Sequence, residues 1–205
     1  MNIKKQLNHN NDNLRLHYKD PLLRESICNK IMTWLPQSPC EYVVVCIGTD
    51  RSTGDSLGPL TGSILSELKP KHINIHGTLH EPIHAQNLRE KTDFIKRMYR
   101  NPFIIAIDAC LGRGKSVGQI ITGVGPLEPG AALNKKLPSV GNIHITGVVN
   151  ISGFMEYSIL QNTRLSIVLD MAKNIAYILQ MINQKLTYNN SRSTVSLSEI
   201  KQQRI

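Results

Sequence analysis

Two aspartates, Asp55 and Asp108, follow stretches of sequence that are typical of buried β-strands. Residues 42–47 (YVVVCI) lead into a glycine-rich segment that contains Asp55, and residues 103–107 (FIIAI) lead directly into Asp108. A carboxylate at the end of a core strand is costly unless it has partners or a function. In an open parallel sheet the carboxyl ends of the strands share one edge, where ligands bind. The two aspartates therefore predict one site and indicate an enzyme.

Each aspartate also has a structural interpretation. Asp55 lies just before a helix expected from Leu57 onward and could cap it, and Asp50 in the same loop could share the work, with one carboxylate capping and the other reacting. Asp108 could accept amide hydrogens from the glycine-rich turn that follows it. Because perturbed carboxylate pairs gather at active sites, the two aspartates together favour a function.

Histidines follow the next expected strand, at the same edge of the sheet. His80 and His84 are four residues apart, but Pro82 between them argues against a helical metal-binding pair. A histidine here could orient a carboxylate, act as a base or bind a metal, and His84 is the candidate.

Other potential nucleophiles and a phosphate-binding pattern are weaker signals. Ser52, Ser56 and Cys110 lie near the same edge, but none stands in a nucleophile elbow. Residues 112–116 (GRGKS) end like a P-loop, yet the first glycine of that motif would fall on Ala109, and strand-like residues follow instead of a helix. Neither a nucleophilic serine or cysteine nor a nucleotide site is favoured.

Composition excludes several classes of protein. The chain has 205 residues, of which 40% are hydrophobic, enough for one α/β domain. No apolar run approaches the about 18 residues of a membrane span, and no apolar stretch follows the N-terminal lysines, so we expect a cytoplasmic protein without a membrane partner. The net charge is +9, but no nucleic-acid-binding motif accompanies it, so a nucleic-acid partner is not expected. The four cysteines form no C-x-x-C pair, which argues against zinc.

The elements that position these residues alternate along the first half of the chain. Apolar residues at helical spacing alternate with short continuous apolar runs, which predicts right-handed βαβ crossovers and a parallel sheet. The expected helices cover residues 21–35, 57–68, 87–99, 154–160 and 165–186. The expected strands cover residues 42–47, 73–75, 103–109, 117–124 and 143–151. The strand at 117–124 has no room for a preceding helix and should pair antiparallel.

The sequence thus predicts a single three-layer α/β domain, with a mostly parallel sheet flanked by helices, over residues 21–186. We expect a flexible N-terminal arm over residues 1–20 and a flexible C-terminal tail over residues 187–205. Residues 125–142 form a long loop rich in glycine, proline and lysine, and long loops in compact domains are often functional.

Three segments carry a resemblance to a known family. They are GTDRSTGDSLGP at residues 48–59, IIAIDAC at 104–110 and GVGPLEPGAALNKKLPSVGN at 123–142. In this combination the chain resembles the YyaC family of sporulation proteins, which is related to the germination protease of spore-forming bacteria and more distantly to hydrogenase maturation proteases. The resemblance covers roughly residues 40–185. It implies a phosphorylase/hydrolase-like α/β fold with a twisted central sheet.

The resemblance also implies an activity. In germination protease, an aspartate in a D-x-L-G-P motif and one in an I-D-A motif are thought to be catalytic, and these match Asp55 and Asp108. The implied protein is a sporulation-associated peptidase that needs no cofactor and acts on a protein or peptide, such as a spore protein, in the sporulating cell or spore. Asp50 and His84 would support the pair. The loop residues expected near the substrate are Gly54, Gly58, Gly141 and Asn142.

Two alternatives stay open. In hydrogenase maturation proteases the corresponding carboxylates help to hold nickel with a histidine, so a divalent metal bound by Asp55, Asp108 and either His84 or His144 is one alternative. The other is a non-catalytic protein-binding module that grips a partner through the 125–142 loop. Association into a homo-oligomer is also open. In the metal-free reading, two close carboxylates share one proton, so that one acts as base and the other as acid.

Overall fold

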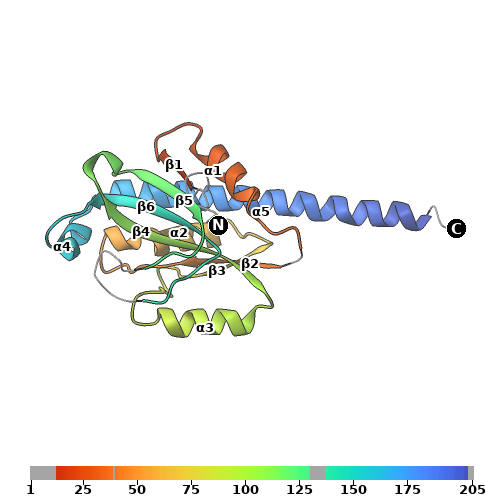
Figure 1. Cartoon of the computed structure of the whole chain (residues 1–205), viewed down its shortest axis with the longest axis horizontal. Helices are drawn as coiled ribbons and strands as arrows, with labels where there is room; N and C mark the ends of the chain where they lie inside the picture. Colours follow the sequence, from red (N-terminus) through yellow and green to blue (C-terminus); the bar gives the residue numbers. More distant parts are fainter. Residues whose placement is uncertain (1–12, 39, 130–136, 203–205) are drawn as a thin grey trace, which may run out of the picture.

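A six-stranded sheet forms the centre of the structure, a computed structural model that describes residues 13–38, 40–129 and 137–202 (Figure 1). The strands lie in the order β1-β5-β6-β4-β2-β3. The parallel part of the sheet consists of β6 (Ile143–Ile151), β4 (Pro102–Gly112), β2 (Glu41–Cys46) and β3 (Ile73–His76). The antiparallel part consists of β5 (Gln119–Val124) and β1 (Asn13–His17). The mostly parallel α/β sheet and the antiparallel pairing of the strand near residues 117–124 are thereby confirmed.

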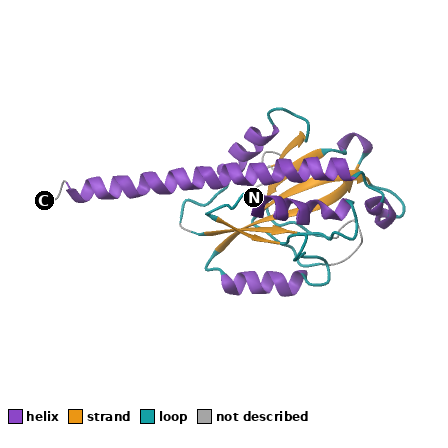
Figure 2. Cartoon of the chain, turned by 180° about the vertical axis from the view of Figure 1, so that it is seen from behind, coloured by secondary structure: helices purple, strands orange, loops and turns teal. Residues whose placement is uncertain are grey.

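Helices cover both faces of the sheet and make three layers (Figures 1 and 2). One face packs on α1 (Leu23–Met32), α2 (Leu57–Glu67) and α5 (Leu165–Gln202). The other face packs on α3 (Leu88–Met98). Successive strand residues point to opposite faces, so in β2 Val44 belongs to the first core and Val43 and Val45 to the second. Both faces of the central strands are apolar because both are covered.

The order of the strands places a topological switch point between β2 and β4. From β2 the chain passes through α2 to β3 on one side of β2, and then through α3 to β4 on the other side. In open α/β sheets, ligands bind outside the carboxyl ends of the strands at such a point. The fold therefore predicts a site where β2 and β4 end.

Strand β4 continues past the end of its neighbour β2. The last β2–β4 pair joins Cys46 to Ile107, whereas β4 goes on to pair with β6, Asp108 lying opposite Thr146. Asp108 is thus the first residue of β4 that has lost its β2 neighbour. The sequence predicted a strand ending at residue 109; the strand runs to Gly112 because β6 still supplies a partner.

Both predicted chain ends differ from the structure. Asn13–His17 is strand β1, paired antiparallel with β5, so the arm predicted over residues 1–20 is wrong for these five residues. The alternation of Leu14 and Leu16 with polar residues explains this, because both leucines pack against the main core. At the other end, α5 does not stop near residue 186 but continues to Gln202.

The first part of α5 is a core helix that also passes a test for membrane spans. Leu165–Thr187 has 23 residues and a mean hydropathy of 1.4, which is long and apolar enough to cross a bilayer by length and composition, contrary to our expectation that no run would qualify. Of the apolar window, 44% is buried inside the fold, and its side chains pack against α1 and α2. These contacts belong to a helix that completes the core of an α/β domain.

Candidate functional site

A pocket of about 340 Å³ lies at the switch point, where β2 and β4 end. Its walls come from segments far apart in the chain: the loop after β2, the end of β4, the loop before α3, both ends of the 125–142 loop, and α4 (Glu156–Gln161). The 125–142 loop is closed at its base, since the amide of Leu127 donates to the carbonyl of Val140 over 2.8 Å and the amide of Val140 donates back over 2.9 Å. Residues 130–136 of this loop lie outside the described residues.

The structure brings Asp50, Asp55, His84 and Asp108 together around this pocket. The loop that carries His84 reaches the site because the amide of Gly48 donates to the carbonyl of Ile83 over 2.8 Å. That bond fixes the loop beside the end of β2. The sequence placed the four residues at one sheet edge, and the structure places them at one pocket.

Asp108 has the most perturbed environment in the pocket. Its side chain follows the strand alternation onto the face of Ile104 and Ala106, and its Oδ1 accepts a hydrogen bond from the amide of Ala109 over 2.8 Å. Burial raises the pKa of Asp108 well above its usual value; the Ala109 amide lowers it, and the negative charge of Asp55 raises it further. Burial is the largest of these effects. The environment therefore favours a protonated Asp108 beside a charged Asp55.

Asp55 lies in a short 3₁₀ turn, Gly54–Ser56, that leads into α2. Its backbone carbonyl accepts a hydrogen bond from the amide of Thr49 over 3.1 Å, which closes the loop after β2. The N-cap position of α2 is Ser56. The capping role considered for Asp55 is therefore not the one that the structure gives it, and its side chain lines the pocket instead.

His84 is half-buried and Asp50 is exposed, and both line the pocket. The Nδ1 atom of His84 accepts a hydrogen bond from the amide of Gln86 over 3.3 Å, so the neutral ring carries its proton on Nε2. Asp50 is exposed, and its Oδ1 accepts a bond of 3.4 Å from the hydroxyl of Thr49. Each of these two residues can contribute a polar contact to a ligand.

The four loop residues expected near the substrate do not line the pocket. A Cβ atom on Gly58 would stand 2.1 Å from the carbonyl oxygen of Ile47, so this glycine lets α2 pack against the end of β2. A Cβ on Gly54 would stand 2.7 Å from the Cδ2 atom of Leu160. Gly141 has φ of +104°, and the Oδ1 of Asn142 accepts the amide of Ile104 over 2.7 Å. These residues set the backbone of the site rather than contact a ligand.

The three candidate nucleophiles, Cys110, Ser56 and Ser52, differ in protonation and in hydrogen bonding. Burial raises the pKa of Cys110 to about 11, although a hydrogen bond with Thr146 opposes the shift, so its thiol is neutral at physiological pH. The hydroxyl of Ser56 donates to the carbonyl of Thr53 over 2.6 Å. Ser52 lines the pocket, is only 4% exposed, and its hydroxyl has no hydrogen-bond partner among the described residues. Of the three, Ser52 alone has an unused polar atom at the site.

The part of the chain that the structure describes contains no preformed metal site. Within those residues, no group of three or more histidine, cysteine, aspartate and glutamate side chains is arranged to hold an ion. His144 does not line the pocket; its Nδ1 donates to the carbonyl of Gly125 over 3.1 Å.

Sequence reasoning missed the apolar walls of the pocket. They include Leu127, Leu137, Tyr157 and Leu160, which come from the 125–142 loop and from α4. The 125–142 loop was expected to be functional, but no pattern singles out Leu127 or Leu137 within it, and none marks Tyr157 or Leu160. Their role depends on how distant segments fold back over the end of the sheet.

Comparison with known proteins gives the family. The family model described as "Protein of unknown function (DUF1256)" matches residues 15–178. A Bacillus subtilis (strain 168) protein named "Uncharacterized protein YyaC" is 58% identical over 134 residues, which cover 65% of this chain and 65% of that protein, slightly under two thirds of its length. Among solved structures, the [NiFe] hydrogenase maturation protease HycI from Thermococcus kodakarensis KOD1 matches with a TM-score of 0.47 and 16% identity, over 75% of this chain and 99% of that one. The expected YyaC resemblance is confirmed, and the chain belongs to the DUF1256 family.

Proposed function

We propose that this protein is a peptidase in which Asp55 and Asp108 act as a proton-sharing pair. The observation that carries the proposal is the pocket at the β2–β4 switch point, which both carboxyl groups line and in which burial and the charge of Asp55 raise the pKa of Asp108. A carboxylate beside a protonated carboxyl group supplies a base and an acid at one place.

The proposed reaction is direct attack of water on a peptide carbonyl. The Asp55 carboxylate takes a proton from the water as its oxygen bonds to the carbonyl carbon, while the Asp108 carboxyl group donates a hydrogen bond to the carbonyl oxygen. When the tetrahedral intermediate collapses, the C–N bond breaks and the amine nitrogen leaves with the proton held by Asp55. The products are a carboxylic acid and an amine, and the pair returns to its starting protonation.

Ser52 supports this chemistry as a positioning group. Its hydroxyl is buried and has no partner among the described residues, so it would donate to the substrate backbone after turning toward the bound substrate. Cys110 is not needed, because its thiol is neutral and the attack by water requires no covalent intermediate. His84 would hold the substrate or a water through Nε2.

The substrate class and the place of the activity in the cell are also part of the proposal. The similarity to germination protease in the D-x-L-G-P and I-D-A motifs supports a protein or peptide substrate in the cytoplasm of a sporulating cell or spore. The reaction as written needs no cofactor. A metal held by Asp55, Asp108 and His84 is the competing mechanism.

The experiment is digestion of a protein extract from sporulating cells with the purified full-length protein, followed by mass spectrometry of newly formed N-termini. We expect new termini in the treated sample, at the same yield with and without a chelator. Cleavage that disappears with chelator and returns with a divalent cation would instead support the metal mechanism. Absence of new termini in every sample would contradict the peptidase proposal and favour a protein-binding module.

A further inference from the structure

A group of large apolar side chains is exposed where β6 passes into α4. Ile151, Phe154, Met155 and Tyr157 are 49%, 96%, 67% and 58% exposed. Single exposed apolar residues are ordinary on protein surfaces, but contiguous ones mark interaction sites. We call these four residues the apolar ridge.

The backbone of the apolar ridge is held in a costly conformation. Met155, which precedes α4, has φ of +66° and ψ of +50°, a left-handed conformation that residues other than glycine seldom adopt. Strained backbone of this kind clusters at ligand-binding sites. The segment thus combines a left-handed residue with exposed apolar side chains.

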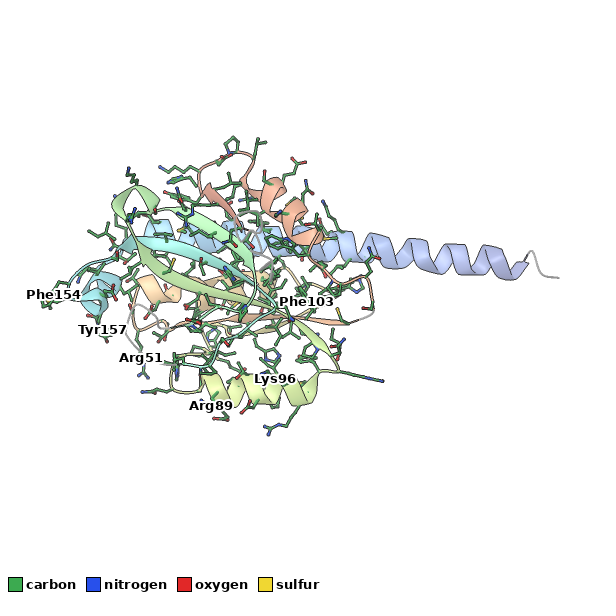
Figure 3. The ribbon with its side chains drawn as sticks, in the orientation of Figure 1. Arg51, Arg89, Lys96, Phe103, Phe154 and Tyr157 are labelled. Atoms are coloured by element: carbon green, nitrogen blue, oxygen red, sulfur yellow. The ribbon has the colours of Figure 1, made fainter. Side chains whose placement is uncertain are left out.

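The apolar ridge is continuous with the pocket and fixed relative to it. Tyr157 belongs both to the ridge and to the pocket lining, and Leu160 of the same helix lines the pocket and is 3% exposed. Leu160 packs against Gly54, the neighbour of Asp55. In Figure 3, Phe154, Tyr157 and Arg51 lie at the same end of the molecule, and Tyr157 and Arg51 line the pocket.

The charge of the pocket is opposite to that of the whole chain. Asp50, Asp55, Asp108 and Glu128 line it, with Arg51 as the cation among the described lining residues. Even with Asp108 protonated, three carboxylates face one guanidinium group, in a chain whose net charge is +9. A positively charged ligand is therefore complementary to the pocket.

We propose that the apolar ridge and the acidic pocket mouth together bind an extended polypeptide segment that carries an apolar side chain for the ridge and a lysine or arginine for Asp50 and Glu128. The inference rests on the proposed function, because the bound segment would be the substrate, and it names the substrate class that the proposal leaves open. The ridge would anchor the segment next to the pocket, and the basic residue would set which peptide bond reaches Asp55 and Asp108.

Binding is measured separately from cleavage by using the full-length Asp108→Asn protein and fluorescence anisotropy of labelled peptides of equal length. The peptides combine an apolar or serine-rich half with a lysine-containing or glutamate-containing half. We expect the apolar, lysine-containing peptide to bind most tightly. Asp50→Asn combined with Glu128→Gln should remove the preference for lysine over glutamate, and added salt should have the same effect because these carboxylates are exposed.

The ridge is tested with a matched pair of double substitutions. Phe154→Ser with Met155→Ser should weaken binding of the best peptide about tenfold, equivalent to about 1.4 kcal/mol. Phe94→Ser with Met98→Ser removes the same residue types from the exposed side of α3, where they are 46% and 59% exposed, and should leave affinity unchanged. All four side chains are exposed, so both variants should fold, as circular dichroism would verify.

Equal effects of the two double substitutions, or equal binding of the lysine and glutamate peptides, would overturn the inference. A third outcome would also overturn the inference: the starting protein self-associates in a sedimentation experiment, and the ridge variant binds peptide normally but no longer self-associates. The ridge would then be a contact between copies of this chain. If the peptides bind as expected but the wild-type protein does not hydrolyse them, only the peptidase proposal is refuted. If the rate of hydrolysis is the same with and without the ridge substitutions, and the same for lysine and glutamate peptides, only the recognition inference is refuted.

Discussion

Asp108→Asn and Asp55→Asn should each lower the rate of peptide hydrolysis by about a hundredfold to ten-thousandfold. Both substitutions keep the size of the side chain. Asp55→Asn removes the proton acceptor and Asp108→Asn removes the carboxyl group that donates to the carbonyl oxygen, so the loss should appear in kcat rather than in KM. The assay is cleavage of a peptide identified in the extract digestion, with quantified product. Asp93→Asn is the control, because Asp93 is exposed on α3 and does not line the pocket, so its rate should stay within about twofold of wild type.

The same assay gives a pH dependence with a defined sign. Only protonated Asp108 can donate to the carbonyl oxygen, and its pKa is raised well above the usual value by burial and by Asp55. The rate should therefore fall as pH rises through that raised pKa. A wild-type rate in either asparagine variant would contradict the pair mechanism.

Gly58→Ala should destabilise the protein by about 3 kcal/mol. The added Cβ would stand 2.1 Å from the carbonyl oxygen of Ile47 and 2.8 Å from its amide nitrogen, both backbone atoms at the end of a central strand. Helix α2 would have to move away from β2, and the buried contacts of Leu57 and Leu65 would loosen. The measurement is urea unfolding followed by circular dichroism.

Gly114→Ala is the matched control for that substitution. Its added Cβ would meet only the Cγ2 atom of Ile151, at 3.9 Å, which is ordinary van der Waals distance. Its unfolding free energy should stay within about 0.5 kcal/mol of wild type. Equal unfolding midpoints for the two variants would show that the close approach of α2 to β2 is not needed for stability.

The central part of the fold could be predicted from the sequence because its signals are local. The continuous apolar runs at residues 42–47 and 103–107 identify strands covered on both faces, and the helical spacing between them leaves βαβ crossovers as the simplest connection. Once those strands are parallel, geometry places Asp55 and Asp108 near one edge. That step needs no knowledge of side-chain contacts.

The parts that could not be predicted depend on pairing between distant segments. Residues 13–17 form a strand only because β5 offers a free edge, and β4 extends to Gly112 only because β6 continues beside it. The spacing in residues 48–58 predicted a glycine-rich loop, but not that Gly58 meets Ile47 or that Gly54 meets Leu160. Such close approaches are set by tertiary packing, to which a single sequence gives no direct signal.

The shared proton of Asp55 and Asp108 can be measured without knowing the substrate, and it tests the proposed chemistry most directly. The measurement is an NMR titration of the Asp108 carboxyl carbon in protein labelled with ¹³C at aspartate, for wild type and for Asp55→Asn. We expect Asp108 to titrate well above an ordinary aspartate in wild type, and at a lower pH in Asp55→Asn, because the neighbouring negative charge is gone. An Asp108 that titrates like an exposed aspartate, or that is unchanged by Asp55→Asn, would contradict the account.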